Sequence, residues 1–411
     1  MAPWRMYMMP PNESLCAESS RACGTVLRLG GICLMIGGAS AFITACHTAG
    51  GPSSPAADPS DARAVAKLGL QESDKPVREL VKGWKPPRKI VVSVDTPDRI
   101  AWLQPAAPNV KLIPISRQGA RGSEILPMLG DADAVVGACN EQIVEVGKNL
   151  HWIHADSAGI EYCAPYLKSK EGILLTNMKR VSGLEISDHV IALMFALTRG
   201  IDGIMRSQLQ QKWVRGGGVA RTRLWEIDGR TMFVAGLGGI GTDTAQKAHA
   251  LGMRVVATRS SSREGPNFVE YVGLPDETPK LVSQADVIVN ALPLTEKTKG
   301  VFDAAMFARV KKGAYYISVG RGGTTVTNDL IDALKSGQLG GAALDVTDPE
   351  PLPDGHPLWS APNIIISPHS SSYGDNLGGE GDRAWRVKRE LIRRYAAGEK
   401  IYNVADAEKG F

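Results

Sequence analysis

From Lys89 onward, short apolar runs rich in β-branched residues alternate with segments of helical or turn character. The first series of runs is "KIVVSV", "VKLIPI", "DAVVG", "HWIHA" and "GILLTN". The second series is "TMFVAG", "MRVVAT", "DVIVNAL", "AYYISVG", "GAALDV" and "NIIISP". Such alternation is typical of parallel sheets covered by helices, so we expect an α/β fold with two doubly wound domains.

A stretch of helical periodicity separates the two series. It reads "GLEISDHVIALMFALTRGIDGIMRSQLQ", with Leu184, Ile191 and Met194 at helical spacing. The pattern predicts one long helix that joins the two domains.

The N-terminal region follows a different pattern. The uncharged run "LGGICLMIGGASAFITAC" follows Arg28 and is short for a membrane span of about 20 residues, but typical of a signal-peptide core. Its end, "ITAC", resembles a bacterial lipobox, in which the cysteine is lipidated. We expect 1–46 to be a signal peptide and the protein to be an exported lipoprotein, tethered through Cys46 on the periplasmic side of a membrane. One alternative is a cytoplasmic protein whose start codon is misassigned. Another is that the apolar run is an uncleaved membrane anchor.

The residues after Cys46 are rich in Pro, Ser and Ala, as in "TAGGPSSPAADPSDARA". This composition predicts a flexible linker over 47–88.

Composition narrows the possible partners. With 411 residues, 43% hydrophobic and 22% charged, the chain is an ordinary globular protein of more than one domain. A net charge of +4 gives no case for nucleic-acid binding. Cys139 and Cys163 lack CxxC spacing, so neither a metal site nor a disulfide framework is suggested, and we expect both cysteines to be structurally buried.

A glycine-rich turn follows the first strand of the second series. Gly236, Gly238 and Gly241 form GxGxxG between "TMFVA" and the helical run "TDTAQKAHAL". The spacing permits a tight turn and lets a pyrophosphate approach the backbone at the helix N-terminus. This context predicts a dinucleotide site.

The residue at the end of the next strand favours one dinucleotide. An Asp or Glu about 20 residues past the glycines usually binds the ribose hydroxyls, but here the chain has Arg259 followed by Ser260. A guanidinium binds a 2′-phosphate that a carboxylate would repel. We therefore expect NADP(H) to be preferred, with NAD(H) possible; an exposed loop arginine is the structural alternative.

Three polar residues follow later strands or the loops beyond them. Arg321 comes after "YYISVG", Glu350 lies in "DPEPLP", and His369 follows "NIIISP". Open α/β sheets place ligands at the carboxyl ends of their strands. Together these side chains offer a cation for a carboxylate, a proton donor and a carboxylate beside it.

These segments, with "LPLTEKTKGVFDAAMFARVKKGAYYISVGRGG" and "LIDALKSGQLGGAALDVTDPEPLPDGHPLW", strongly resemble the D-isomer-specific 2-hydroxyacid dehydrogenases. The resemblance spans about 89–403. It implies a Rossmann NAD(P)-binding domain, 188–369, inserted in a flavodoxin-like substrate-binding domain made of 89–187 and 370–411. The family also implies a homodimer.

The resemblance implies a role for each matching residue. Arg321 would bind the substrate carboxylate and carbonyl, His369 would be the general acid/base, and Glu350 would hydrogen-bond that histidine. The backbone N–H groups of Ala158, Gly159 and Ile160, in "DSAGIEY", would bind the substrate carboxylate. The remaining positions would bind or line the cofactor: Gly239, Ile240, Arg259, Leu292, Pro293, Thr298, Val319 and Asp345, the last near the nicotinamide carboxamide.

The implied activity is the reversible, NAD(P)H-dependent reduction of a small 2-keto acid, with glyoxylate or hydroxypyruvate as the leading substrates. Glu161 stands where Asp is common, Ser318 where Asn is usual, and "SDH" replaces "AEH". These departures bear on the substrate and not on the reaction class. A catalytically weak, nucleotide-sensing binding module of the same fold is the alternative, which a turnover assay separates from an enzyme.

Overall fold

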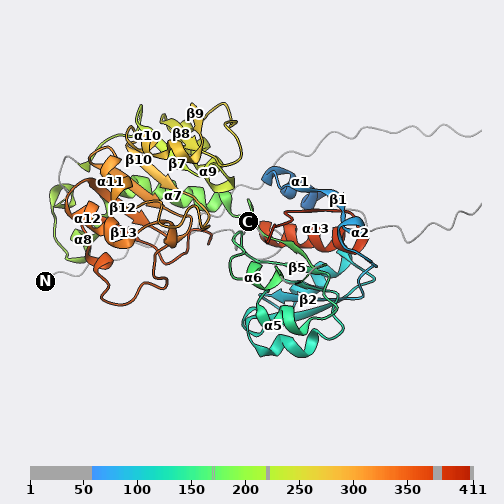
Figure 1. The fold of residues 1–411 in the computed structure, drawn as a ribbon. Helices are drawn as coiled ribbons and strands as arrows, with labels where there is room; N and C mark the ends of the chain where they lie inside the picture. The colour runs from blue at the N-terminus through green and yellow to red at the C-terminus, as the bar shows by residue number, and fades with distance from the viewer. Residues whose placement is uncertain (1–57, 169, 171, 219–222, 374–381, 408–411) are drawn as a thin grey trace, which may run out of the picture. The chain divides into compact units, whose positions relative to one another are not determined.

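The two series of apolar runs form two separate parallel sheets (Figure 1). The computed structural model describes residues 58–168, 170, 172–218, 223–373 and 382–407, which all belong to one compact unit, Ser53–Phe411. The predicted signal peptide, 1–46, lies outside the described residues, as does the predicted linker through residue 57. The expected α/β class is confirmed.

The five-stranded sheet is built from the first series, in the order β3-β2-β4-β5-β6. This order is that of a flavodoxin-like sheet, with the first strand at an inner position. The strands are β2 (Lys89–Val94), β3 (Lys111–Ser116), β4 (Ala134–Val136), β5 (Trp152–His154) and β6 (Leu174–Thr176). The intervening helices are α3 (Arg99–Leu103), α4 (Arg117–Arg121), α5 (Glu141–Val146) and α6 (Ala164–Leu167), with 3₁₀ helices η1 (Gln104–Ala106) and η2 (Ser123–Met128).

The seven-stranded sheet contains all six runs of the second series and one strand that the pattern did not predict, β9. Its order is β13-β12-β11-β10-β7-β8-β9, so the strand order reverses between β7 and β10. Open α/β sheets bind ligands at such a point. The strands are β7 (Thr231–Ala235), β8 (Arg254–Thr258), β9 (Tyr271–Gly273), β10 (Val287–Asn290), β11 (Ala314–Ser318), β12 (Leu339–Leu344) and β13 (Ile364–Ile366). The helices are α9 (Gly239–Ala250), α10 (Thr278–Val282), α11 (Ala304–Arg309) and α12 (Thr327–Lys335), with η3 (Arg215–Gly218), η5 (Pro275–Glu277), η6 (Gly322–Thr324) and η7 (Pro357–Ser360).

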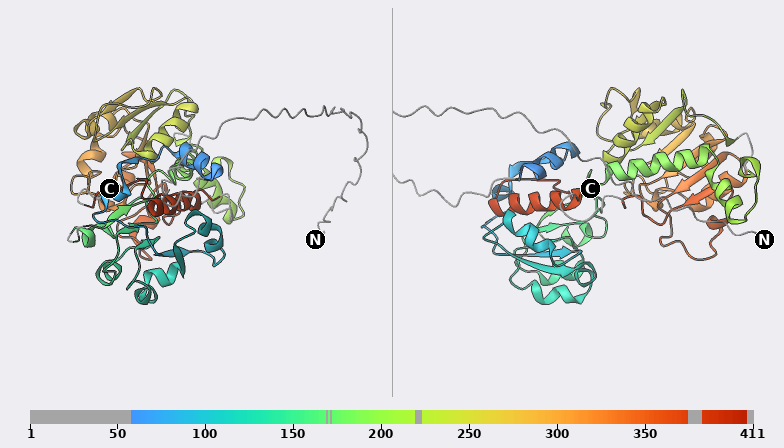
Figure 2. Two further views of the ribbon diagram at one scale, coloured as in Figure 1. Left: turned by 90° about the vertical axis from the view of Figure 1, so that its right-hand side faces the viewer. Right: turned by 180° about the vertical axis from the view of Figure 1, so that it is seen from behind.

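The predicted long helix is two helices, so that expectation was wrong in one respect. α7 (Gly183–Thr198) ends before Gly200, whose φ of 64° is left-handed, and α8 (Ile201–Leu209) begins after it. Glycine adopts this conformation without steric cost and commonly ends a helix. α7 packs on α9 and lies along the seven-stranded sheet, as the right-hand view of Figure 2 shows.

Part of the expected linker is folded. α1 (Pro59–Leu68), β1 (Glu72–Pro76) and α2 (Val77–Leu80) occupy it, and β1 pairs antiparallel with β14 (Lys400–Tyr402). α1 lies beside α13 (Arg383–Ala397), near the end of the chain (Figure 1). The carboxylate of Asp61 is 3.0 Å from a guanidinium nitrogen of both Arg386 and Arg389. The polar composition of this segment did not predict helix α1, because the arginines that bind its Asp61 are more than 300 positions away in the sequence.

Cys139 and Cys163 are buried as expected, but the structure contradicts the expectation that they form no disulfide. Cys139 and Cys163 form a disulfide, with their Cα atoms 5.5 Å apart and 24 positions between them in sequence. Because β4 and β5 are parallel neighbours, the segments after their carboxyl ends meet, and each contributes one cysteine. Spacing alone could not predict that adjacency.

None of the helices in the described part of the chain is long and apolar enough to cross a membrane.

Candidate functional site

The strand ends and one loop surround a cavity of about 380 Å³. Four of the predicted site residues line it: Gly159, Arg321, Glu350 and His369. The other lining residues are Ser157, Glu161, Tyr162, Leu294, Gly322, Gly323 and Thr347. Residues that sequence analysis assigned to one reaction therefore share one pocket.

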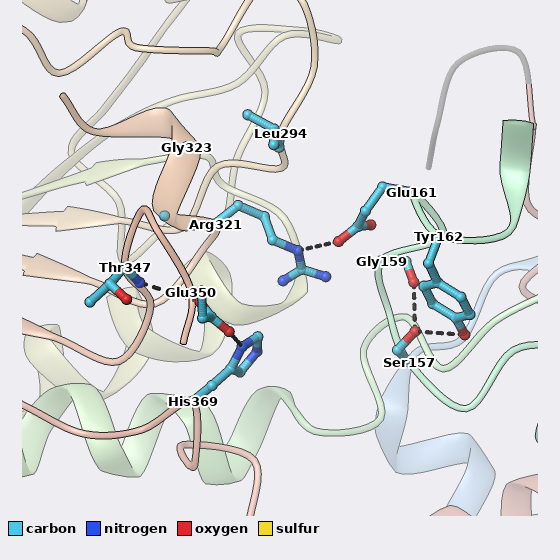
Figure 3. A pocket seen from close by; sticks show the side chains of 11 residues that line it. Ser157, Gly159, Glu161, Tyr162, Leu294, Arg321, Gly323, Thr347, Glu350 and His369 are labelled. Atoms are coloured by element: carbon cyan, nitrogen blue, oxygen red, sulfur yellow. Dashed lines mark hydrogen bonds and ion pairs between the residues drawn. The ribbon is translucent and has the colours of Figure 1, made fainter. Parts of the chain in front are cut away.

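His369 and Glu350 form a close pair (Figure 3). Nδ1 of His369 lies 2.5 Å from Oε1 of Glu350, and the two side chains are 48% and 38% exposed. Glu350 Oε2 accepts a hydrogen bond from the Thr347 backbone N–H at 3.3 Å. Because Nδ1 engages the carboxylate, Nε2 is the ring nitrogen left for a ligand in the pocket.

The backbone at His369 is held in an uncommon conformation. Its φ is 50°, in the left-handed region, and its N–H donates to the carbonyl oxygens of Asp345 (2.9 Å) and Ser367 (3.0 Å). A non-glycine residue with positive φ is uncommon and clusters at functional sites. The side chain on this turn lines the pocket and lies beside Glu350.

Asp345 stabilises the turn at His369 through hydrogen bonds to residues on both sides of it. Its buried carboxylate accepts hydrogen bonds from Ser367 Oγ (2.6 Å) and from the backbone N–H groups of Ser370 (2.9 Å) and Ser371 (3.1 Å). Burial raises the pKa of Asp345, but these hydrogen bonds outweigh it and the pKa is lowered overall. The observed contacts position the His369 turn, while a contact with a nicotinamide stays a prediction.

Arg321 lies shortly after β11 and is the N-cap residue of the 3₁₀ helix η6. Its Nε donates to Oε1 of Glu161 at 2.6 Å, and its Nη1 donates to the Gly320 carbonyl at 2.9 Å. The guanidinium thus comes from the seven-stranded sheet and its carboxylate partner from the loop after β5.

Asn290 was not predicted as a site residue, although it supports the Arg321 segment. It is the last residue of β10, is buried, and donates from Nδ2 to Thr324 Oγ1 (2.7 Å) and Tyr316 Oη (2.8 Å). Burial raises the pKa of Tyr316 to about 12, which keeps this phenol protonated. An asparagine that ends an apolar strand was the available signal.

Hydrogen bonds within the loop 157–162, and from residues outside it, stabilise its conformation. Ser157 Oγ donates to the Gly159 carbonyl (2.6 Å) and lies 3.2 Å from Tyr162 Oη (Figure 3). Asn177 Nδ2 donates to the Ala158 carbonyl at 2.8 Å. The carbonyl of buried Ile160 accepts from the N–H of Cys163, the disulfide residue, at 2.9 Å. Neither Ser157 nor Asn177 was predicted as a site residue.

The glycine turn lies where β7 passes into α9. Gly236 has a φ of 93°, and a Cβ atom on Gly241 would lie 2.1 Å from the Gly236 carbonyl oxygen. A Cβ on Gly238 would meet no described atom within 4 Å. Gly239 and Ile240 form the first turn of the helix, which spans 12 residues. The close turn and the open space before a helix N-terminus fit a pyrophosphate group.

Arg259 follows β8 directly. Its backbone N–H donates to the Gly273 carbonyl at 3.0 Å, and its Nη1 donates to the Glu264 carbonyl at 3.2 Å. Burial lowers the pKa of Lys179, and the nearby cations Arg180 and Arg259 lower it further. Ser260, the next residue, is exposed. Arg259 therefore lies close enough to Lys179 for the two positive charges to interact.

The other predicted cofactor residues also lie at strand ends. Leu292 and Pro293 follow β10, and Thr298 Oγ1 donates to the Pro293 carbonyl at 2.6 Å. Val319 is buried directly after β11. Within the described ranges, no group of three or more His, Cys, Asp or Glu side chains is arranged to hold a metal ion.

Comparison with known proteins gives one consistent result. Residues 191–371 match the family described as "D-isomer specific 2-hydroxyacid dehydrogenase, NAD binding domain". The chain is 33% identical to a glycerate dehydrogenase of Methylorubrum extorquens, over 54% of this chain and 69% of that protein. It is 28% identical to glyoxylate/hydroxypyruvate reductase A of Photorhabdus laumondii, over 77% of this chain and 97% of the relative. A solved structure of a D-isomer specific 2-hydroxyacid dehydrogenase family protein from Aeromonas salmonicida aligns with 78% of this chain and 99% of its own, at a TM-score of 0.66 and 28% identity.

Proposed function

The chain belongs to the D-isomer specific 2-hydroxyacid dehydrogenase family, and on that premise we propose that it reduces a small 2-keto acid to the D-2-hydroxy acid with NADPH. The observation that carries the proposal is the shared pocket of Arg321, Glu350 and His369. These side chains come from three separate segments after β11, β12 and β13.

The mechanism assigns one task to each side chain. Arg321, with the backbone N–H groups of the 157–162 loop, holds the substrate carboxylate and stabilises the charge that develops on the carbonyl oxygen. When bound, the nicotinamide supplies a hydride from its C4 to C2 of the substrate. His369 donates the proton to the carbonyl oxygen from Nε2, while Glu350 keeps the ring oriented through Nδ1 at 2.5 Å. The reverse direction uses His369 as the base.

The preference for NADPH rests on Arg259. No carboxylate follows Thr258 until Glu264, and the Glu264 contact to Arg259 is made by its backbone carbonyl. A guanidinium binds a phosphate with charge-assisted hydrogen bonds. Lys179, whose pKa is lowered in part by the charge of Arg259, adds a second positive charge near this arginine.

For the substrate we propose glyoxylate or hydroxypyruvate. The name of the Photorhabdus laumondii relative, 97% of which is covered by the match, supports this choice. A cavity of about 380 Å³ is ample for a compound of two or three carbon atoms.

We further propose that the enzyme is exported and anchored through a lipidated Cys46, which lies outside the described residues. The Cys139–Cys163 disulfide supports this location because disulfides persist in oxidising compartments such as the bacterial periplasm. Cys46→Ser should abolish labelling by a radioactive or clickable fatty acid. Intact leader on abundant cytosolic enzyme would instead favour the cytoplasmic alternative.

The experiment that tests the function is an NADPH-oxidation screen with purified protein over glyoxylate, hydroxypyruvate, pyruvate and longer 2-keto acids, each repeated with NADH. We expect turnover with at least one small acid, and a D-configured product by chiral chromatography. Cofactor binding without turnover on any of these acids would favour the nucleotide-sensing alternative.

A further inference from the structure

Glu161 is a charged residue of the pocket lining to which the proposed reaction gives no role. It is 46% exposed, and its Oε1 accepts the hydrogen bond from Nε of Arg321 at 2.6 Å, as the dashed line in Figure 3 shows. The same arginine is the group proposed to bind the substrate carboxylate. A protein carboxylate and a substrate carboxylate must therefore share one guanidinium.

The positions of the other N–H groups of Arg321 indicate how two carboxylates can bind this guanidinium together. Nη1 contacts the Gly320 carbonyl at 2.9 Å. Nη2 lies against the 157–162 loop, since a Cβ on Gly159 would fall 1.9 Å from it. A guanidinium presents five N–H donors in a rigid fork. A substrate carboxylate beside the loop can therefore use the Nη side while Glu161 keeps Nε.

The charges around the cavity are paired. Among the described residues that line it, the positively charged or protonatable side chains are Arg321 and His369, and the acidic ones are Glu161 and Glu350. Each acid is hydrogen-bonded to one of the two bases. One substrate carboxylate finds a cation in Arg321, but a second negative group would meet two carboxylates and no further cation from these lining residues.

We propose that Glu161 determines specificity by admitting 2-keto acids with a single negative charge and rejecting those with a second carboxylate or a phosphate. The proposal rests on the proposed function, since it concerns the substrate of the same site. Like charges that are brought together in a partly desolvated pocket oppose binding, which is a common basis of discrimination between ligands.

The test compares two acids with five-carbon chains, 2-oxopentanoate and 2-oxoglutarate, which differ at the far end by a methyl group and a carboxylate. Wild type, Glu161→Gln, Glu161→Asp and Glu145→Gln are assayed for kcat/KM on both acids. Glu145 is an exposed acid of α5 outside the pocket lining, so its variant controls for the loss of one negative charge elsewhere.

We expect the wild type to favour 2-oxopentanoate, and Glu161→Gln to shift the ratio of kcat/KM values about tenfold towards 2-oxoglutarate. Glu161→Asp, which keeps the charge, and Glu145→Gln should retain the wild-type preference. A wild type without a preference, or a ratio unchanged in Glu161→Gln, would overturn the proposal.

A binding measurement separates this inference from the proposed function. Calorimetry on enzyme saturated with NADP⁺, which cannot reduce a keto acid, gives the dissociation constants of the same two acids. A preference for binding 2-oxopentanoate that is smaller in Glu161→Gln than in wild type supports selection by charge, even where wild type shows no turnover. A lack of turnover counts only against the proposed reaction. Equal shifts in Glu161→Gln and Glu145→Gln would contradict a local role for Glu161.

Discussion

A histidine stands at the carboxyl end of a parallel strand in each of the two sheets, yet the two have opposite surroundings. His369 follows β13 of the seven-stranded sheet, is 48% exposed and faces Glu350 at 2.5 Å. His154 is the last residue of β5 in the five-stranded sheet and is fully buried. It contacts Thr176 Oγ1 through Nδ1 at 2.9 Å and Met178 Sδ through Nε2 at 3.2 Å.

The difference shows that a position at the end of a strand does not by itself bring a side chain to the pocket. Burial lowers the pKa of His154 to about 4, opposed by the charge of Asp156 and assisted by that of Lys388, so the ring is neutral at neutral pH. His369 instead leaves its strand through a turn with φ of 50°, which brings it to the pocket beside a carboxylate. His154 is buried, whereas His369 lines the pocket.

The largest effect is expected from replacing His369, the exposed one of the two histidines. His369→Ala should lower kcat by about 10²–10⁴, the usual contribution of a positioned general acid, with nucleotide affinity nearly unchanged. Initial rates with NADPH and a 2-keto acid, together with a fluorescence titration of nucleotide binding, measure both quantities. Near-normal turnover of His369→Ala would contradict the mechanism.

The next prediction concerns the covalent bond of the five-stranded region. Reduction of Cys139–Cys163, which closes a loop of 24 positions, should destabilise that region by about 3 kcal/mol in the chain-entropy account. Hydrogen exchange followed by mass spectrometry should show faster exchange around β4, β5 and α6, and little change in the seven-stranded sheet. The Cys139→Ala/Cys163→Ala double variant should not respond to reductant. Equal exchange with and without reductant in the wild type would contradict the prediction.

The buried histidine should make stability depend on pH. The folded-state pKa of about 4 lies below the ordinary 6.5, so between these values the unfolded chain binds a proton that the folded chain does not. The contribution of His154 to the free energy of unfolding is fully present above pH 6.5. It is lost as the pH falls towards 4, by about 3 kcal/mol in total. Urea unfolding across this range should show a smaller pH dependence for His154→Asn than for wild type. Identical slopes in the two proteins would refute the assignment to His154.

The smallest expected effect lies at the end of β8 in the seven-stranded sheet. Arg259 bound to a 2′-phosphate should favour NADPH by about ten- to a hundredfold in kcat/KM, and Arg259→Asp should reverse or abolish this preference. Arg263→Gln is a suitable control because Arg263, in the same loop, pairs with Glu277. A wild type that favours NADH would mean that Arg259 does not contact the cofactor.

Much of the fold and part of the site could be predicted because their signals are local. Each apolar run from Lys89 on became a strand, since β-branched residues between turn residues encode strands over a few positions. The glycine spacing, Arg321, Glu350 and His369 were identified from motifs that stand directly after such runs. The break at Gly200 is also a local feature, but the apolar spacing continues across it and predicted a single helix.

Short-range periodicity and turn chemistry specify the two parallel sheets, the glycine turn and the side chains at the ends of the strands, so these features follow from the sequence. Which of the strand ends meet depends on the tertiary fold. The Cys139–Cys163 bond, the pairing of β1 with β14 and the Glu161–Arg321 contact each depend on the order of strands or on the meeting of distant segments. Glu161 and Arg321 are 160 positions apart, and no local pattern encodes a contact over that separation.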